Sequence, residues 1–297
     1  MKTFIKVLQL SLLTISLSFT VNFSIAQKLI KLHTQESWKQ PYKPFRIAGN
    51  LYYVGTYDLA SYLITTKQGN ILINTGLAES ASMIRSNVEA LGFKFWDIKI
   101  LLCTHAHYDH VGAMAAIKKM TGAKMMIHAY DAAVLGDGGN SDFIFGGKGM
   151  MFQPVNADRL LHDQDTVSLG DMHIVVLHHP GHTKGACSFL FDVKDEHRSY
   201  RVLIANMPSI LDETKLSGMP GYPDVGKDYK YTLDAMKKLQ FDIWLASHAS
   251  QFDLHTKRKP GDGYNPEVFI DRKGYDAAIN ELQKSYSEKL AAEGLRQ

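Results

Sequence analysis

Apolar and polar residues alternate along this chain in short blocks, which predicts strands interleaved with helices. In residues 45–76, apolar runs are separated or ended by glycines, a pattern typical of a meander of short strands. The predicted strands are 51–54, 61–66, 71–74, 98–104, 124–128, 166–169, 173–178, 186–193, 201–205 and 241–247. Helical spacing of apolar residues predicts helices over 79–91, 111–120, 131–135 and 227–239, and one or two more within 266–292. Strands followed by helices occur twice, so we expect an α/β protein with two packed sheets and helices outside.

The first 26 residues have the pattern of a signal peptide. Lys2 and Lys6 precede an apolar stretch over 7–21, and the small residues at 24–26 suit a signal peptidase. Cleavage after Ala26 would leave a single domain over 27–297 that is periplasmic, with no membrane insertion. The alternative is that the segment is retained as an anchor, for which its apolar part is short and interrupted.

The charge balance argues against a nucleic-acid partner. The formal net charge is +3 for the 297 residues, and removal of the two N-terminal lysines lowers it to +1. Nucleic-acid binding calls for a strongly basic patch. With 45% hydrophobic residues, the chain can bury a substantial core.

The chain has two cysteines, Cys103 and Cys187, both in apolar runs. A disulfide is compatible with export, but two cysteines make no disulfide framework, and we favour buried free thiols.

Residues 136–149 form a glycine-rich segment with an apolar tip, Phe143–Phe145. Loops of this composition often cover active sites, and a plain surface loop with packed aromatics is the alternative.

The strongest chemical signal is the run His105-Ala106-His107-Tyr108-Asp109-His110, directly after an apolar strand. Imidazole and carboxylate groups are the ligands that zinc takes in proteins. His105 and His107 are placed to bind one ion, and Asp109 and His110 a second about 3.5–4 Å away, as in two-metal hydrolases.

Two later histidines lie at strand ends, where a rigid scaffold can present them. His182 lies in the turn Pro180-Gly181-His182-Thr183-Lys184-Gly185, and His248 follows the strand over 241–247. The economical assignment puts His105, His107 and His182 on one zinc, and Asp109, His110 and His248 on the other. Each set leaves positions open for water and substrate.

The remaining histidines are weaker candidates. His178 and His179 adjoin the turn of His182, and His255 suits a supporting or surface role. His33, His128, His162, His173 and His197 have no partner motif.

Together, these motifs resemble the metallo-β-lactamase superfamily, whose signature is HxHxDH followed by two later histidines. Within it, the chain resembles the class B, subclass 3 β-lactamases, and most of all the GOB group. The similar segments are 38–47, 49–64, 180–188, 204–209 and 247–254, and the resemblance spans residues 36–285. It implies an αβ/βα sandwich with two zinc ions.

Three positions depart from the patterns of related proteins. His105 stands where the GOB group typically carries glutamine, which implies a conventional first zinc site. Asn74 stands where many members of the superfamily have an aspartate that orients a ligand. Met207 stands where other lactamases have cysteine or serine, and the bridging aspartate of many relatives is absent, so His248 must complete the second site.

The resemblance implies a periplasmic β-lactamase that acts on penicillins, cephalosporins and carbapenems through a metal-bound hydroxide. Such a water has a pKa lowered to about 7. Asp109 would also orient the hydroxide, and Ser209 would anchor the substrate carboxylate, with Thr183 and Lys184 as weaker candidates. Trp38 and the loop over 143–145 would form apolar walls, although core packing explains Trp38 equally well.

The alternatives are a lactonase or thioesterase on the same fold, and a non-catalytic zinc-binding envelope protein. Many hydrolases on this fold carry the bridging aspartate, and a structural zinc site has a closed shell of four ligands. Neither feature is evident here. We expect a monomer.

Overall fold

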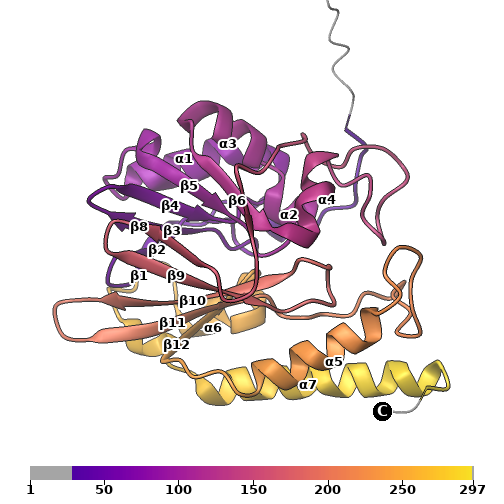
Figure 1. Cartoon of the computed structure of the whole chain (residues 1–297). Coiled ribbons are helices and arrows are strands. Elements are labelled where there is room, and N and C mark those ends of the chain that lie inside the picture. Colours follow the sequence, from indigo (N-terminus) through magenta and orange to yellow (C-terminus); the bar gives the residue numbers. More distant parts are fainter. Residues whose placement is uncertain (1–28, 296–297) are drawn as a thin grey trace, which may run out of the picture.

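Two β-sheets packed face to face form the centre of the molecule (Figure 1). The computed structural model describes residues 29–295, so the predicted signal peptide and the Ala26–Gln27 junction lie outside the described residues. The first sheet has seven strands in sequential order, from β1 to β7, and the second has five in the order β12-β11-β10-β9-β8. The predicted fold class, an αβ/βα sandwich, is confirmed.

The strands of the first sheet are β1 (Phe45–Ala48), β2 (Leu51–Tyr53), β3 (Tyr62–Thr66), β4 (Gly69–Ile73), β5 (Ile98–Leu102), β6 (Lys124–His128) and β7 (Arg159–Leu161). Those of the second are β8 (Thr166–Leu169), β9 (Met172–His178), β10 (Cys187–Lys194), β11 (Ser199–Ala205) and β12 (Ile243–Ala246). Pairing is antiparallel from β1 to β4 and parallel from β4 to β7. In the second sheet only the pair β11–β12 is parallel.

The α-helices are α1 (Ala81–Ala90), α2 (Tyr108–Val111), α3 (Met114–Thr121), α4 (Ala132–Gly136), α5 (Val225–Met236), α6 (Leu254–Lys257) and α7 (Arg272–Ala292). Figure 1 shows α1 and α3 on the outer side of the first sheet, and α5 and α7 on the outer side of the second. No helix within residues 29–295 is long and apolar enough to cross a membrane.

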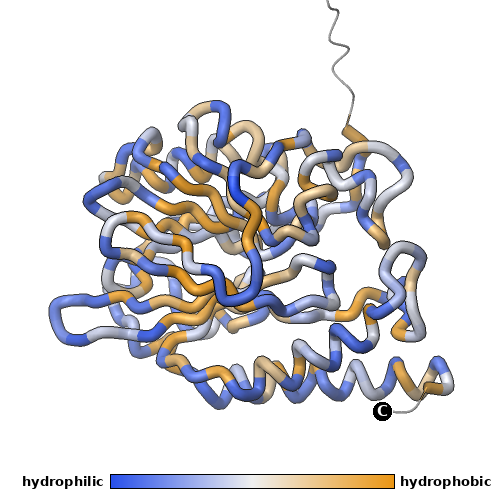
Figure 2. The backbone as a smooth tube through the Cα atoms, viewed as in Figure 1, coloured by the Kyte–Doolittle hydropathy of each residue, from blue (hydrophilic) through white to orange (hydrophobic). Residues whose placement is uncertain are grey.

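The core lies between the sheets because strand residues alternate inward and outward. In β10, Phe189, Phe191 and Val193 are buried, while Asp192 and Lys194 are exposed. Figure 2 shows the same division, with hydrophobic strands inside and hydrophilic loops and helix faces outside. One cluster of buried side chains draws on strands of both sheets, so the two layers share a core.

The predicted helix over 111–120 corresponds mostly to α3, while its first residue, Val111, ends the short helix α2, and Gly112 and Ala113 separate the two helices. The amide of Gly112 donates to the carbonyl of Gly76 at 2.9 Å, and a β-carbon at Gly112 would lie 2.5 Å from the amide nitrogen of Ala78. This close approach requires glycine, and it holds the short helix α2 against the segment that follows β4. The strand β7, at an edge of the first sheet, was missed because it is only three residues long.

The packing between the sheets predicts which side chains contribute most to the free energy of unfolding. Phe189 has no exposed surface, so we expect Phe189→Ala to lower the free energy of unfolding by about 3–5 kcal/mol through lost burial and a residual cavity. Asp192→Ala, on the exposed face of the same strand, should change it by less than about 0.5 kcal/mol. Urea denaturation measures both, and equal effects would contradict this view of the core.

Candidate metal centre

The histidines and the aspartate of the motif lie together at one end of the sandwich, just beyond strand β5. His105 and His107 lie in the loop after β5, and Asp109 and His110 lie in the short helix α2. The turn between β9 and β10 brings in His182. The rings of His105, His107 and His182 have centroids 4.7–4.8 Å apart.

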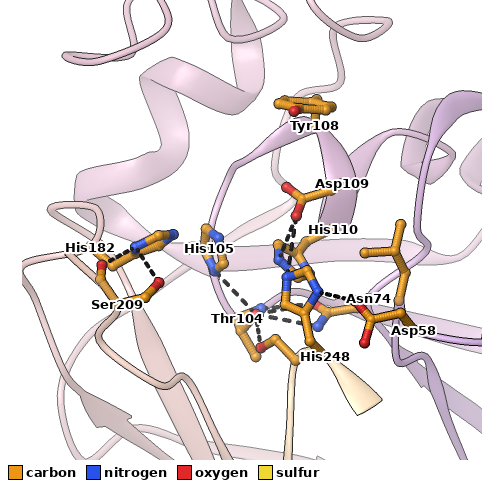
Figure 3. A network of polar contacts seen from close by, with 12 residues as sticks. Asp58, Asn74, Thr104, His105, Tyr108, Asp109, His110, His182, Ser209 and His248 are labelled. Atoms are coloured by element: carbon orange, nitrogen blue, oxygen red, sulfur yellow. Dashed lines mark hydrogen bonds and ion pairs between the residues drawn. The ribbon is translucent and has the colours of Figure 1, made fainter. Parts of the chain in front are cut away.

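A second group forms around the carboxylate of Asp109 (Figure 3). Its Oδ2 lies 3.2 Å from Nε2 of His110 and 3.4 Å from Nε2 of His248, which follows β12. The two groups adjoin, since the ring centroids of His105 and His110 are 4.3 Å apart. The geometry for holding a metal ion is met by His105, His107 and His182, and also by His105, Asp109 and His110.

One buried nitrogen indicates that the site is built for an ion. His105 is 2% exposed, and its Nε2 has no hydrogen-bond partner among the described residues. A buried polar atom without a partner is costly, and a bound cation would remove that cost. The residues present therefore fit a divalent metal.

Burial keeps the imidazoles of the first group mostly neutral, the form that binds metal. Burial and the neighbouring imidazoles, that of His110 first, lower the pKa of His105 well below its usual value. Burial likewise lowers the pKa of His182 to about 3. His107 differs, because Asp142 outweighs the effect of burial and raises its pKa.

In the second group, burial lowers the pKa of His110 as in the first, whereas His248 and Asp109 are governed by their charged neighbours. Burial alone would lower the pKa of His248, but contacts with Asp109 and Asp58 raise it to about 9. Burial alone would raise the pKa of Asp109, but His110 and His248 hold it well below its usual range. Asp109 is therefore a carboxylate at neutral pH.

His182 and His248 are each oriented by a polar group on another element. Nδ1 of His182 donates to the carbonyl oxygen of Ser209 at 2.8 Å, and Nδ1 of His248 lies 3.1 Å from Oδ2 of Asp58. No spacing pattern indicates Asp58, because it lies 190 residues from His248 along the chain.

His107 and His105 also have orienting partners. Nε2 of His107 lies 3.3 Å from Oδ2 of Asp142, and Nδ1 of His105 lies 3.3 Å from the hydroxyl of Thr104. Asp142 lies in the glycine-rich loop, which could have indicated it. Asn74 acts through Thr104, because its side-chain oxygen accepts a hydrogen bond from the amide of Thr104 at 3.0 Å.

The site opens into a cavity of about 140 Å³. Its lining is Trp38, His105, His107, Tyr108, Asp109, His110, Phe145, His182, Asn206, Met207, Ser209, Leu211, Ser247, His248 and Gln251. Trp38 and Phe145 line it as predicted. Phe143 instead packs on Tyr222, with ring centroids 5.0 Å apart.

The other residues singled out from the sequence have protein partners. His178 and His255 bond to the carbonyls of Lys184 and Tyr57, and His179 bonds to the hydroxyl of Ser188. Two weaker anchor candidates are also engaged: the hydroxyl of Thr183 donates to Asp131, and Lys184 lies over the ring of Tyr222. Both cysteines are free and buried, as favoured.

Comparisons with known proteins agree with this geometry. The family described as the metallo-beta-lactamase superfamily matches residues 56–195. A β-lactamase from Chitinophaga pinensis is 64% identical, with 89% of this chain and 100% of that chain covered and a TM-score of 0.88. The class B3 di-zinc metallo-β-lactamase LRA-12 from an Alaskan soil metagenome is 65% identical, with the same coverage and a TM-score of 0.87.

The metallo-β-lactamase GOB-18 from Elizabethkingia meningoseptica is 56% identical, with 90% of this chain and 99% of that chain covered and a TM-score of 0.88. Among curated proteins, a hydroxyacylglutathione hydrolase from Pelagibacter ubique is 33% identical over 45% of this chain. The chain spans less than half the length of that protein, 46%, and 39% of a probable metallo-hydrolase from Burkholderia pseudomallei. The chain belongs to the metallo-β-lactamase superfamily and, within it, to the class B3 group.

The contact between Asp58 and His248 predicts that loss of the Asp58 carboxylate weakens binding of one metal ion and not of the other. Replacing Asp58 with asparagine removes the carboxylate that holds Nδ1 of His248, and loss of such a partner typically weakens metal binding about 10–100-fold. We expect Asp58→Asn to bind one ion much as the wild type does and the second more weakly, as measured by metal titration with cobalt(II) absorption. Unchanged affinity for both ions would show that Asp58 does not support the site.

Proposed function

We propose that the protein is a di-zinc β-lactamase that hydrolyses the β-lactam amide of penicillins, cephalosporins and carbapenems and so confers antibiotic resistance. The observation that carries this proposal is the convergence of five imidazoles and one carboxylate, with Nε2 of His105 buried and without a partner among the described residues. Support comes from β-lactamases at 56–65% identity that align over their full lengths or nearly so.

The proposed ligands are His105, His107 and His182 for the first zinc, and Asp109, His110 and His248 for the second. Two zinc ions bound there would supply a water ionised near neutral pH and positive charge for the substrate carbonyl and the departing nitrogen. Three neutral imidazoles leave the charge of the first ion undiminished.

Asp109 is the proposed catalytic residue beyond its role as a ligand. Its carboxylate, ionised and 8% exposed, accepts a hydrogen bond from the attacking water and so orients it. Oδ2 of Asp109 lies 3.2 Å from Nε2 of His110 and 3.4 Å from Nε2 of His248, so the three proposed ligands of the second zinc already face one another. No covalent intermediate with the protein is required.

Ser209 is the proposed anchor for the substrate carboxylate. It lines the cavity, and its hydroxyl lies 3.4 Å from Nδ1 of His182, while its carbonyl oxygen accepts from the same nitrogen. The hydroxyl can turn toward a substrate while the carbonyl continues to hold His182. Trp38 and Phe145 supply apolar walls for the substrate side chains.

The partner is a small β-lactam, and we propose that the protein acts as a monomer in the periplasm after cleavage of the segment 1–26. A lactone or thioester substrate on the same site is the second candidate, because hydroxyacylglutathione hydrolases are among the curated relatives. Their similarity covers less than half of this chain, whereas the β-lactamases cover nine-tenths.

Metal removal tests the proposal as a whole. The purified mature chain should hydrolyse a carbapenem, lose the activity on chelation and regain it when zinc is returned. Absorbance of the intact β-lactam ring measures the rate. If the chain binds two zinc ions but hydrolyses no β-lactam, the β-lactamase proposal is wrong and the substrate is a lactone or a thioester.

A matched pair of histidines tests the assignment of ligands. His248→Ala should lower kcat/KM by about 100-fold or more, because it removes a proposed ligand of the second zinc. His255→Ala, seven positions further along the chain, should change kcat/KM less than about threefold, because that imidazole bonds to the carbonyl of Tyr57. A large loss at His255 with none at His248 would reverse the assignment.

A further inference from the structure

One buried carboxylate links the two turns that carry the first group of imidazoles. Oδ2 of Asp131 accepts hydrogen bonds from the amide of Ala106 at 2.9 Å and from the hydroxyl of Thr183 at 2.7 Å. Oδ1 accepts from the amide of Gly185 at 2.7 Å. Ala106 lies between His105 and His107, and Thr183 follows His182. A single planar group therefore sets the distance between these turns.

Asp131 is 1% exposed, and its three donors are all neutral. Burying a carboxylate without a cation is costly, so such a group is retained where its hydrogen bonds fix a conformation that apolar residues would not specify. The groups that Asp131 joins are the two loops of the proposed metal site.

Gly185 packs closely against the backbone and the carboxylate of Asp131. A β-carbon at Gly185 would lie 2.6 Å from the amide nitrogen of Asp131 and 2.7 Å from its Cγ. The turn of His182 thus approaches the start of α4 so closely that only glycine fits at position 185. Asp131 is the residue that Gly185 contacts there.

We propose that Asp131 is a positioning residue that holds His182 at ligating distance from His105 and His107 and thereby sets the affinity of the first metal site. This inference rests on the proposed zinc site, and it concerns a residue whose hydrogen bonds go to Ala106, Thr183 and Gly185 rather than to a proposed ligand ring. Its three hydrogen bonds go to the backbone and side chain of residues beside the ligands.

Asparagine cannot replace Asp131, although it has the same shape. The carboxylate accepts on both oxygens, whereas an amide accepts on one and donates on the other. In either orientation of the amide, its NH₂ group faces the backbone N–H of Ala106 or of Gly185. One link between the turns is lost, and the distance between them is no longer fixed.

The test compares Asp131→Asn with Asp195→Asn. Asp195 serves as the control because it also accepts from two backbone amides, those of His197 and Arg198, and from the hydroxyls of Tyr200 and Tyr264, with none of these beside a proposed ligand. Zinc affinity is measured by chelator competition, and the metal environment by the absorption bands of the cobalt(II) form.

We expect Asp131→Asn to bind one of its two zinc ions about 10–100-fold more weakly than the wild type, with altered cobalt bands. Asp195→Asn should keep both affinities and the same bands, even where its melting temperature falls. Changes in the bands separate a positioning role from a loss of stability, since stability alone leaves the spectrum of the folded fraction unchanged. Wild-type zinc affinity and bands in Asp131→Asn would overturn the inference.

A second pair covers the case in which Asp131→Asn fails to fold. Thr183→Val removes one of the three hydrogen bonds with little change of shape, and Thr183→Ser retains it. We expect weaker binding of one zinc in the valine variant and near wild-type affinity in the serine variant. Equal affinities in the two variants would overturn the inference. Failure of the wild type to bind zinc would instead overturn the proposed function.

Discussion

The burial of several imidazoles around one carboxylate, at the end of an apolar sandwich, is the constraint on which the rest of the structure depends. His105, His107 and His110 are each at most 3% exposed, so their nitrogens cannot rely on water. Each therefore needs a protein partner or an ion. This requirement explains why the loops at this end carry so many polar residues, whereas the strands that support them are almost wholly apolar.

The groups that meet this requirement come from many elements. The loops after β5, β11 and β12, the turn between β9 and β10, and the loop after α4 each bring at least one ligand or orienting group to the site. The two sheets and their shared core hold these loops at fixed separations, so the precision of the site depends on the packing of the sandwich. The position of helix α2 depends on packing in the same way, because the close contact at Gly112 sets where the helix lies relative to the end of β4.

The sequence predicted the local parts of this arrangement well and the long-range parts only through resemblance. The strands over 124–128 and 166–169 have the predicted bounds, because a glycine lies near one end of each apolar run, Gly122 before the first and Gly170 after the second. The cluster at 105–110 is visible because its members are adjacent. Asp58 was not predicted, since only the fold brings it to His248, and the helix split at Gly112 was missed because it arises from a tertiary contact.

Asn74 shows why a departure from a family pattern has to be judged in three dimensions. Its φ is +59°, in the left-handed region that asparagine tolerates better than most residues. Its side-chain oxygen accepts from the amide of Thr104, and its side-chain nitrogen lies 3.3 Å from the hydroxyl of that residue. An aspartate there would accept but could not donate. The amide thus fixes Thr104, which contacts His105, while the carboxylate that orients a ligand of the second group comes from Asp58. The missing aspartate at position 74 is therefore no evidence of a weakened metal site.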